Sequence, residues 1–191
     1  QFGGNLQAFV SGGGALDKNI GEFLNAVGLP TLQGYGLTET SPVVSCNLPG
    51  HIKVETVGPP FKTNQVKIAD DGEILVKGEN VMLGYWKKEN ETKEILRNGW
   101  LHTGDIGMID SNGYLKITDR KKDIIVNHGG DNISPSKIEN VICNDQKIKQ
   151  CLVYGDKKNY LVALIVVEKK DKNDSTIRSI IENFNKKLSI I

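Results

Sequence analysis

Hydrophobic and polar residues in the first 36 positions follow the pattern of an α/β unit. LQAFVSGGG, residues 6–14, predicts a strand that runs into a glycine turn, and TLQGY, residues 31–35, predicts a second short strand. Between them, apolar residues recur at helical spacing: Ile20, Phe23, Leu24 and Val27. Asp17 is expected to cap this helix and Gly28-Leu29-Pro30 to end it. Ligands in such sheets lie where strands end in loops, so both glycine clusters are candidate binding segments.

From about residue 54 the pattern changes to short strands separated by turn signals. The runs VKIA, EILVKG, LHTGDIGMI and YLKIT alternate with the turns DDG and SNG, and ENETKEILRNG predicts one short inserted helix. This texture predicts a small antiparallel sheet or barrel. The run TDRKKD at 118–123 then places five charges in consecutive positions, which favours a surface linker.

Residues 123–191 predict the start of a small α+β domain. SPSKIENVI predicts a helix with Ser134 as cap and Pro135 in its first turn. CLVYGD and LVALIVVE predict two strands joined by the turn DKKN. The apolar run at 160–167 is expected to be a buried strand, because a bilayer span needs roughly 20 helical residues. A last helix is predicted by apolar residues at helical spacing: Ile177, Ile180, Ile181, Phe184 and Leu188.

Composition and charge narrow the function classes. A length of 191 residues suggests one domain or two, with a proper hydrophobic core. The chain has 24 Lys and Arg residues and 23 Asp and Glu residues, which gives a net charge of +1. So small a charge disfavours nucleic acid as a partner and gives no electrostatic attraction to an anionic bilayer. The cysteines, which lack C-x-x-C spacing, argue against a disulfide framework or a zinc site and favour a reducing cytoplasm: Cys46, Cys143 and Cys151.

Two glycine-rich segments carry candidate chemistry, each with an ordinary structural alternative. SGGGAL, residues 11–16, either exposes backbone to a ligand or simply turns between strand and helix. In QGYGLTET, residues 33–40, Thr38 offers a hydroxyl to a phosphate and Glu39 offers hard oxygens suited to Mg²⁺. Taken alone, the same stretch is more simply a turn with a buried Tyr35 and a solvated Glu39.

Further segments are equally ambiguous when each is taken singly. Asp105 in GWLHTGDIG can accept hydrogen bonds from vicinal hydroxyls such as those of ribose, or it can be a turn residue. Arg120 lies in a charge run, where a solvated side chain is usual. GGDNISP at 129–135 can be a functional loop or only a loop and a helix cap. Ordinary polar roles are expected for the histidines: His51, His102 and His128.

The chain resembles the adenylate-forming (AMP-dependent) ligase family, particularly its long-chain fatty acyl-CoA synthetase branch, in segments that follow one another in order: SGGGAL, QGYGLTET, GEILVKGENVMLGYW, GWLHTGDIG, DRKKD and GGDNISPSKIE. The resemblance runs from about residue 7 to 168. It implies an α/β and α+β fold in which residues 1–119 are the C-terminal part of a large adenylation domain, with a small β-barrel-like subdomain at about 54–119. Residues 120–122 are then a hinge, and residues 123–191 an incomplete small C-terminal domain.

The resemblance also implies a two-step reaction that uses ATP, Mg²⁺ and coenzyme A. A fatty acid is activated as an acyl-adenylate with release of pyrophosphate, and the acyl group then passes to the thiol of coenzyme A. Cations and N–H donors must offset the charge of the phosphates in such a reaction. By resemblance, Glu39 binds Mg²⁺, Thr38 contacts the phosphate, and Tyr35 packs on adenine. The resemblance also implies that the backbone of three residues lies around the adenine base: Gln33, Gly34 and Gly36.

Other positions have implied roles at the edges of the site. In the family, one segment lies beside adenine and the acyl carboxylate, and it resembles Gly13, Gly14 and Ala15 of this chain. The proline that the family often has in this segment is missing here. Asp105 is implied to bind the ribose hydroxyls, Arg120 the ribose and phosphate, and Lys122 is implied to be the hinge residue. Gly129 and Gly130 are implied coenzyme A contacts. Relatives commonly have Glu at the place of Asp131 and Ser at that of His128.

The two ends of the sequence suggest a piece of a longer protein. QFGGNLQAF opens the chain without Met or a signal pattern, and the last amphipathic pattern has no Gly or Pro stop. By resemblance, the family's phosphate-binding loop is expected before residue 1, and the C-terminal lysine that contacts the α-phosphate is expected after residue 191. The 191-residue chain alone is therefore predicted not to form an adenylate at a useful rate.

Two alternatives stay open. The chain can belong to an aryl-CoA ligase or carrier-protein loader of the same family, or it can be a non-catalytic nucleotide-binding or interaction module. The expected partners of the leading hypothesis are small molecules: a fatty acid, ATP and coenzyme A. No transmembrane segment is expected, whereas peripheral membrane association and oligomeric state are left open.

Overall fold

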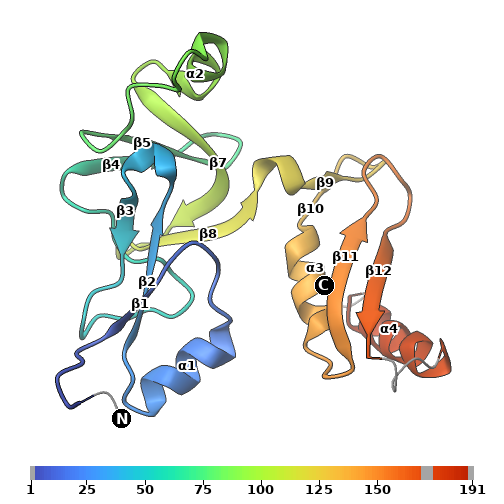
Figure 1. The fold of residues 1–191 in the computed structure, drawn as a ribbon. Helices are drawn as coiled ribbons and strands as arrows, with labels where there is room; N and C mark the ends of the chain where they lie inside the picture. The colour runs from blue at the N-terminus through green and yellow to red at the C-terminus, as the bar shows by residue number, and fades with distance from the viewer. Residues whose placement is uncertain (1–2, 169–173, 189–191) are drawn as a thin grey trace. The chain divides into compact units, whose positions relative to one another are not determined.

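The computed structural model describes residues 3–168 and 174–188 of the chain (Figure 1). The chain divides into two compact units, Gln1–Lys121 and Lys122–Ile191. Each unit has its own cluster of buried apolar side chains. We describe them one at a time.

The first unit begins with the strand–helix–strand arrangement that the hydrophobic pattern predicts. Strands β1 (Phe9–Ser11) and β2 (Thr31–Gly36) pair in parallel, and helix α1 (Lys18–Ala26) connects them (Figure 1). The Asp17 side chain caps this helix by accepting a hydrogen bond from the backbone N–H of Ile20. Strand β3 (Val43–Cys46) joins β2 in antiparallel fashion and completes a three-stranded sheet.

Gly36 allows the backbones of β2 and β3 to approach each other at a register shift. A Cβ atom added at Gly36 would lie 1.7 Å from the carbonyl oxygen of Pro42 and 2.9 Å from the Cα of Val43. Backbone atoms cannot yield as a flexible side chain can, so only glycine fits here. Gly36 is thus a residue that the packing of two strands requires.

An antiparallel sheet forms the rest of the first unit. Strands β4 (Asn64–Ile68), β5 (Glu73–Gly78), β7 (Trp100–Ile109) and β6 (Leu96–Arg97) follow one another across it, and β8 (Leu115–Arg120) pairs with β7. Helix α2 (Glu89–Ile95) lies in the predicted insertion. The sheet confirms the antiparallel prediction, but the barrel-like closure is wrong. Among the described residues, β4 pairs with β5 alone and β8 with β7 alone, so the sheet stays open.

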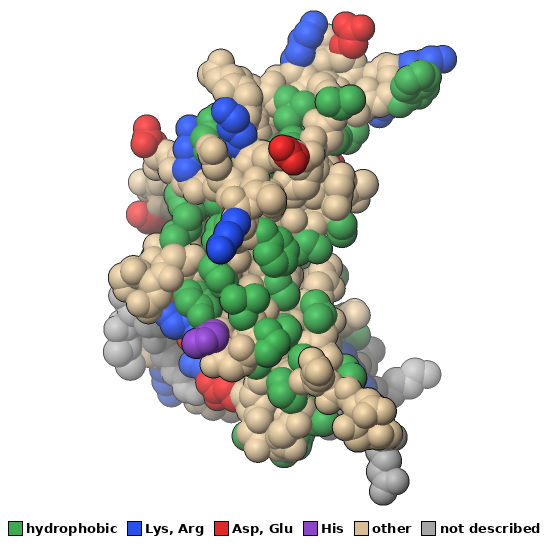
Figure 2. Space-filling model, turned by 90° about the vertical axis from the view of Figure 1, so that its left-hand side faces the viewer, with side chains coloured by type: hydrophobic (Ala, Val, Ile, Leu, Met, Phe, Trp, Pro, Cys, Tyr) green, Lys and Arg blue, Asp and Glu red, His purple; other side chains and the backbone are tan. Residues whose placement is uncertain are grey.

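The hydrophobic core of the first unit lies between its two sheets. Buried side chains from β2, β3, β5, β7 and β8 form one cluster: Tyr35, Val44, Ile74, Val76, Leu101 and Leu115. Hydrophobic side chains also remain on the surface of the chain, and Figure 2 shows a group of them gathered on one face. The exposed hydrophobic side chains of the first unit include Ile20 and Phe23 of α1 and Val27 just after its end.

The charge run at residues 118–123 contains the boundary between the two units, as a linker would, but it is ordered secondary structure and not an irregular segment. Its first half continues β8, in which Arg120 is in register with Asp105 of β7. Its second half is the 3₁₀ turn η2 (Lys121–Asp123). Lys121 Nζ lies 2.6 Å from Asp71 Oδ2 and 2.9 Å from Glu73 Oε2. Partners distant in the sequence therefore hold this segment, which a local charge pattern does not reveal.

Glu73 is a buried carboxylate that ties β5 to β7 and to the end of β8. Only 5% of the residue is exposed. Its oxygens accept hydrogen bonds from the Gly104 N–H and from Lys121, and Oε2 lies 3.0 Å from His102 Nδ1. Burial opposes ionisation, but the hydrogen bonds from His102 and Lys121 together lower the pKa of Glu73 below its ordinary 4.5. The ionised form is therefore the one that stabilises the fold.

The second unit is a small α+β arrangement, as predicted. The short strands β9 (Ile125–Val126) and β10 (Asn132–Ile133) pair with each other, and β11 (Ile148–Tyr154) pairs with β12 (Val162–Val167). Helix α3 (Pro135–Cys143) has Ser134 as its predicted cap, and α4 (Asp174–Leu188) is the predicted last helix. The buried cluster joins both helices to β11: Ile142, Ile148 and Phe184.

Strand β12 is more exposed than the apolar run predicted. Val162, Leu164 and Val166 are 50%, 69% and 46% exposed, so the prediction of a buried strand is wrong for this face. The opposite face contributes Ile165 and Val167 to the cluster around Phe184. The predicted apolar position Leu188 ends α4, and its side chain lies outside the described residues. Within the described residues, no helix is long and apolar enough to cross a membrane.

Replacement of Gly36 by alanine is expected to destabilise the first unit by about 1–3 kcal/mol, because the added methyl group meets the Pro42 backbone. Denaturant unfolding followed by tryptophan fluorescence measures this, since Trp86 and Trp100 both lie in that unit. Gly14→Ala is the matched control, because a Cβ there meets nothing within 4 Å and the backbone is not left-handed. Equal unfolding midpoints for both variants would contradict the close approach.

Replacement of Glu73 by glutamine is expected to lower stability at pH 7 by about 1–3 kcal/mol, because a buried partner of Lys121 and His102 loses its charge. The pKa of Glu73 is lower in the folded chain, so its contribution is present above the unfolded value of 4.5 and is lost as pH falls through the folded value. Glu73→Gln should accordingly flatten the acid limb of a stability–pH profile.

The control for this measurement is Glu55→Gln. Glu55 also faces two lysines, Lys18 and Lys116, but its side chain is 51% exposed. Exposed pairs are worth little, so this change should cost less than about 1 kcal/mol. The two variants should be compared from roughly pH 3 to pH 7, the range in which carboxylates titrate. Equal free energies of unfolding throughout would show that the buried network of Glu73 does not stabilise the fold.

Candidate functional site

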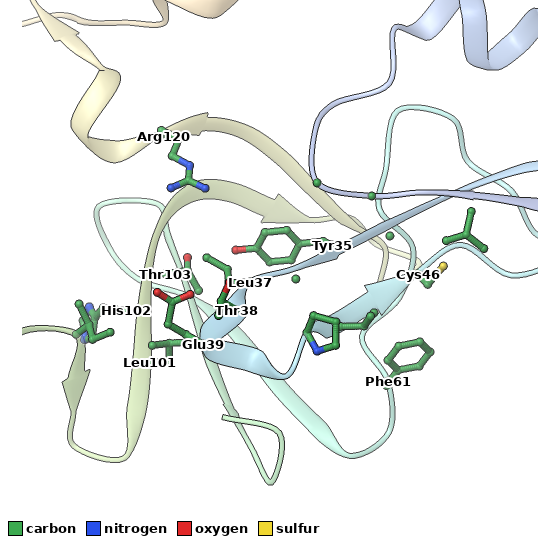
Figure 3. A pocket seen from close by; sticks show the side chains of 18 of the residues that line it. Tyr35, Leu37, Thr38, Glu39, Cys46, Phe61, Leu101, His102, Thr103 and Arg120 are labelled. Carbon is green, nitrogen blue, oxygen red and sulfur yellow. The ribbon is translucent and has the colours of Figure 1, made fainter. Parts of the chain in front are cut away.

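A cavity of about 890 Å³ lies in the first unit, where β2 ends and the QGYGLTET segment turns (Figure 3). Its walls come from β2, β3, the start of β7 and the end of β8. Of the residues predicted from the sequence to serve a site, the following line it: Gly13, Gly34, Tyr35, Gly36, Thr38, Glu39 and Arg120. The structure thus brings together residues that are up to 107 positions apart, from Gly13 to Arg120.

Some predicted site residues do not line the cavity. Gly14 and Ala15 are exposed nearby in the chain. Gln33 is buried, and its side chain accepts a hydrogen bond from the Leu16 N–H and donates one to the Val54 carbonyl. Its amide therefore anchors loops and does not face the cavity. Lys122, Gly129 and Gly130 belong to the second unit.

The two glycines of the second unit lie in a tight loop. Asn127 Oδ1 accepts a hydrogen bond from the Asp131 N–H at 2.9 Å, and Asn127 Nδ2 donates to Asp131 Oδ2 at 2.9 Å. Between these two residues Gly130 has a φ of +90°, which side chains rarely adopt. The Asp that stands where relatives commonly have Glu is therefore used within the loop itself.

Asp105 is buried behind the cavity wall and is held by residues of three strands. Its Oδ2 accepts a hydrogen bond of 2.7 Å from the Tyr35 hydroxyl, and its Oδ1 lies 2.8 Å from Arg120 Nε. The Asp105 N–H donates to Thr103 Oγ1 at 3.1 Å. Asp105 is only 3% exposed and is not a lining residue, whereas the Arg120 side chain is 53% exposed. Arg120 therefore stands between Asp105 and solvent.

Tyr35 has a buried hydroxyl and a ring that forms part of the cavity wall. Burial raises the pKa of Tyr35 far above its ordinary value of 10.0, and the Asp105 carboxylate raises it further. The phenol is consequently a permanent donor to Asp105. Figure 3 shows the hydroxyl end of Tyr35 directed toward Thr103 and Arg120. An apolar ring face with a fixed polar edge suits a flat aromatic ligand.

The turn η1 (Thr38–Thr40) separates two threonines that the sequence alone does not tell apart. Thr40 is fully buried, and its hydroxyl accepts from the Leu37 N–H at 2.9 Å and lies 2.7 Å from the Pro42 carbonyl. Thr38 is exposed and Glu39 is half-buried, and both line the cavity. Thr40 thus stabilises the turn, which leaves Thr38 and Glu39 to face a ligand.

Three of the lining residues that the sequence did not predict for the site have polar side chains: Tyr85, His102 and Thr103. Tyr85 donates a 2.6 Å hydrogen bond to Glu39 Oε1, and Thr103 supports Asp105. His102, for which an ordinary polar role was expected, both lines the cavity and contacts Glu73. Tyr85 lies in GEILVKGENVMLGYW, one of the segments that carry the family resemblance, so the signal was present without indicating the contact with Glu39.

The carboxylate donors at the cavity fit a magnesium ion that arrives with a nucleotide. Within the described residues no cluster of three or more His, Cys, Asp and Glu side chains is present. Mg²⁺ is usually held by one or two carboxylates together with substrate phosphates and water, so a cage of protein ligands is not required. Glu39 provides one carboxylate at the cavity, and Thr38 adds a neighbouring hydroxyl.

Comparisons with known proteins identify the family of the chain. Residues 1–86 match the family described as AMP-binding enzyme, and residues 122–189 match the AMP-binding enzyme C-terminal domain. The long-chain-fatty-acid–CoA ligase FadD15 of Mycobacterium bovis is 45% identical over 167 residues, which are 87% of this chain and 28% of that protein. A 2-succinylbenzoate–CoA ligase of Oceanobacillus iheyensis is 39% identical over 160 residues, covering 79% of this chain and 33% of that ligase.

Solved structures give the same result. The o-succinylbenzoate CoA synthetase MenE of Bacillus subtilis, in complex with its acyl-adenylate intermediate, matches with a TM-score of 0.83 at 30% identity, covering 93% of this chain and 40% of that chain. The same enzyme in complex with ATP and magnesium matches with a TM-score of 0.76 at 33% identity, covering 85% and 37%. Two family matches on one chain lead to one conclusion: the chain belongs to the AMP-binding enzyme family.

Proposed function

We propose that the chain is part of a long-chain fatty acid–CoA ligase, which converts a fatty acid, ATP and coenzyme A into acyl-CoA, AMP and pyrophosphate through an acyl-adenylate. The observation that carries the proposal is the chain of contacts from Tyr35 through Asp105 to Arg120 beside the cavity. The FadD15 relatives, 45% and 44% identical, support the fatty acid as substrate. The chain spans 28% of their length, so the reaction is proposed for the whole protein.

Tyr35 is proposed to bind adenine on its ring face. The ring is held in place because its hydroxyl is bonded to Asp105 and its body packs in the core of the first unit. Gly34 and Gly36 adjoin it on β2 and line the cavity, so backbone groups lie beside the base. Gly13 lines the same cavity from the loop after β1. Gly14, Ala15 and Gln33 are proposed to act only through that loop and the strand next to it.

Asp105 and Arg120 are proposed to exchange partners when a nucleotide binds. A carboxylate has about four acceptor sites, and two of those on Asp105 are taken by Tyr35 and Arg120. Ribose hydroxyls reach the remaining sites if the Arg120 side chain moves outward, which its 53% exposure allows. The displaced guanidinium then stands near the phosphate, where its fixed fork of donors suits anionic oxygens.

Thr38 and Glu39 are proposed to serve the phosphates. Thr38 donates its hydroxyl to a phosphate oxygen, and Glu39 binds Mg²⁺ through the carboxylate that faces the cavity. The ion, when bound, offsets phosphate charge as the carboxylate of the substrate attacks. These roles make Thr38 and Glu39 the proposed catalytic residues of the adenylation step.

The domain organisation and the thiol step are proposed from the second unit. Residues 1–119 are the end of the large domain, residues 120–122 the hinge, and residues 123–191 part of the small domain. The division of the chain between Lys121 and Lys122 supports a hinge at Lys122. Since Lys121 is anchored to Asp71 and Glu73, rotation is expected to start after it. Gly129 and Gly130 are proposed to approach coenzyme A.

A second candidate keeps the adenylation chemistry and changes the acid. The 39% identity to a 2-succinylbenzoate–CoA ligase, and the TM-score of 0.83 to MenE, favour an aromatic acid as the alternative substrate. Competition between long-chain and aromatic acids for acyl-CoA formation by the whole protein distinguishes the two. We also propose that the 191-residue chain alone does not form an adenylate and that the whole protein is cytoplasmic. A non-catalytic nucleotide-binding or interaction module is the alternative from a different class.

Tyr35→Ala is expected to weaken AMP binding by the 191-residue chain roughly 5- to 150-fold, because stacking of a base on an aromatic ring is worth about 1–3 kcal/mol. Isothermal titration calorimetry with AMP and a non-hydrolysable acyl-adenylate analogue measures the loss. Tyr35→Phe keeps the ring and should retain most of the affinity. Tyr160→Ala, a change of the same kind at a 69% exposed position in the second unit, should leave affinity unchanged.

Circular dichroism of each variant shows whether the fold persists. The proposed function fails if the wild-type chain binds neither ligand. It fails as well if Tyr35→Ala, still folded, binds AMP as tightly as Tyr160→Ala does.

A further inference from the structure

Tyr85 contacts the one carboxylate at the cavity that is proposed to bind the metal. Its hydroxyl donates to Glu39 Oε1 at 2.6 Å, a short hydrogen bond of the kind that a charged acceptor makes. Glu39 Oε2 has no partner among the residues that the structure describes. One oxygen of the carboxylate is therefore held by the protein, while the other remains available to the cavity.

The backbone of Glu39 is held by the same loop. The Met82 N–H donates to the Glu39 carbonyl at 2.8 Å, and Asn80 Nδ2 donates to the Thr40 carbonyl at 2.8 Å. Together with the Tyr85 hydroxyl, these bonds attach the segment at residues 80–85 to both the backbone and the side chain of the η1 turn.

Tyr85 is itself anchored at its backbone end. Its N–H donates to Thr92 Oγ1 of α2 at 2.9 Å, and that hydroxyl donates to the Lys88 carbonyl at 2.7 Å. Gly84 lies so close that a Cβ there would be 2.7 Å from Thr92 Cγ2. The phenol therefore reaches Glu39 from a fixed base, which limits the orientations that the carboxylate can take.

Tyr85 is a neutral donor near neutral pH, because a phenol ordinarily ionises only at about pH 10. It therefore holds Glu39 without adding a charge to the site.

We propose that Tyr85 is a positioning residue that orients Glu39 so that a single carboxylate oxygen is presented to the magnesium ion of Mg·ATP. The inference rests on the proposed function, because it assumes that Glu39 binds the metal. Groups that hydrogen-bond to metal ligands fix the orientation of those ligands, and their loss typically costs 10- to 100-fold in metal affinity. In this proposal Tyr85 acts through Glu39.

The test measures how much Mg²⁺ improves ATP binding, using calorimetry with the ion and with EDTA. Tyr85→Phe removes only the hydroxyl, and we expect the improvement to fall about 10- to 100-fold, with metal-free AMP binding unchanged. Tyr160→Phe, at an exposed site in the second unit, is the matched control. In a Glu39→Gln background the Tyr85→Phe change should have little further effect, since both act through one carboxylate.

The possible outcomes are distinct. The inference is overturned, with the proposed function intact, if Glu39→Gln abolishes the benefit of Mg²⁺ while Tyr85→Phe preserves it. It is also overturned if Tyr85→Phe weakens metal-free AMP binding and Mg·ATP binding equally, because that result indicates a merely structural role. Absence of any Mg²⁺ benefit in the wild-type chain overturns the role of Glu39 itself, and the inference with it.

Discussion

The buried carboxylate of Asp105 is the interaction on which the first unit and its site both depend. A charge with 3% exposure must be paired, and here the partners are the Tyr35 hydroxyl and the Arg120 guanidinium. Tyr35 comes from the three-stranded sheet, whereas Asp105 and Arg120 come from neighbouring strands of the antiparallel sheet. The contact that joins the two sheets therefore also places an aromatic ring and a half-exposed cation at the cavity.

Around this contact, each part of the cavity has its own support. Thr40 and the loop at residues 80–85 hold the turn that presents Thr38 and Glu39, while Glu73 holds His102 and Lys121. Lys121 is the last residue of the first unit, so the segment proposed as a hinge begins at an anchored position. A hinge needs only a few residues that absorb a change in backbone dihedral angles, so an anchored Lys121 is compatible with rotation that starts after it.

Local signals in the sequence predicted local structure well. The Asp17 and Ser134 caps and the helices that follow them depend on neighbouring residues, and the structure confirms them. The family motifs likewise indicated seven of the residues that line the cavity: Gly13, Gly34, Tyr35, Gly36, Thr38, Glu39 and Arg120. By contrast, the bonds from Tyr85 to Glu39 and from Lys121 to Glu73 span 46 and 48 positions, and no local pattern encodes them. The exposed face of β12 was mispredicted because an apolar run does not show what covers it.

The most direct test of the central role of Asp105 compares AMP with 2′,3′-dideoxy-AMP, which lacks both ribose hydroxyls, in the wild type and in Asp105→Asn. Hydrogen bonds to a charged group are worth about 1.5–3 kcal/mol. The wild-type chain should therefore prefer AMP by about 10-fold or more, and Asp105→Asn, shown to be folded by circular dichroism, should lose most of that preference. Full retention of the preference in Asp105→Asn would contradict the account.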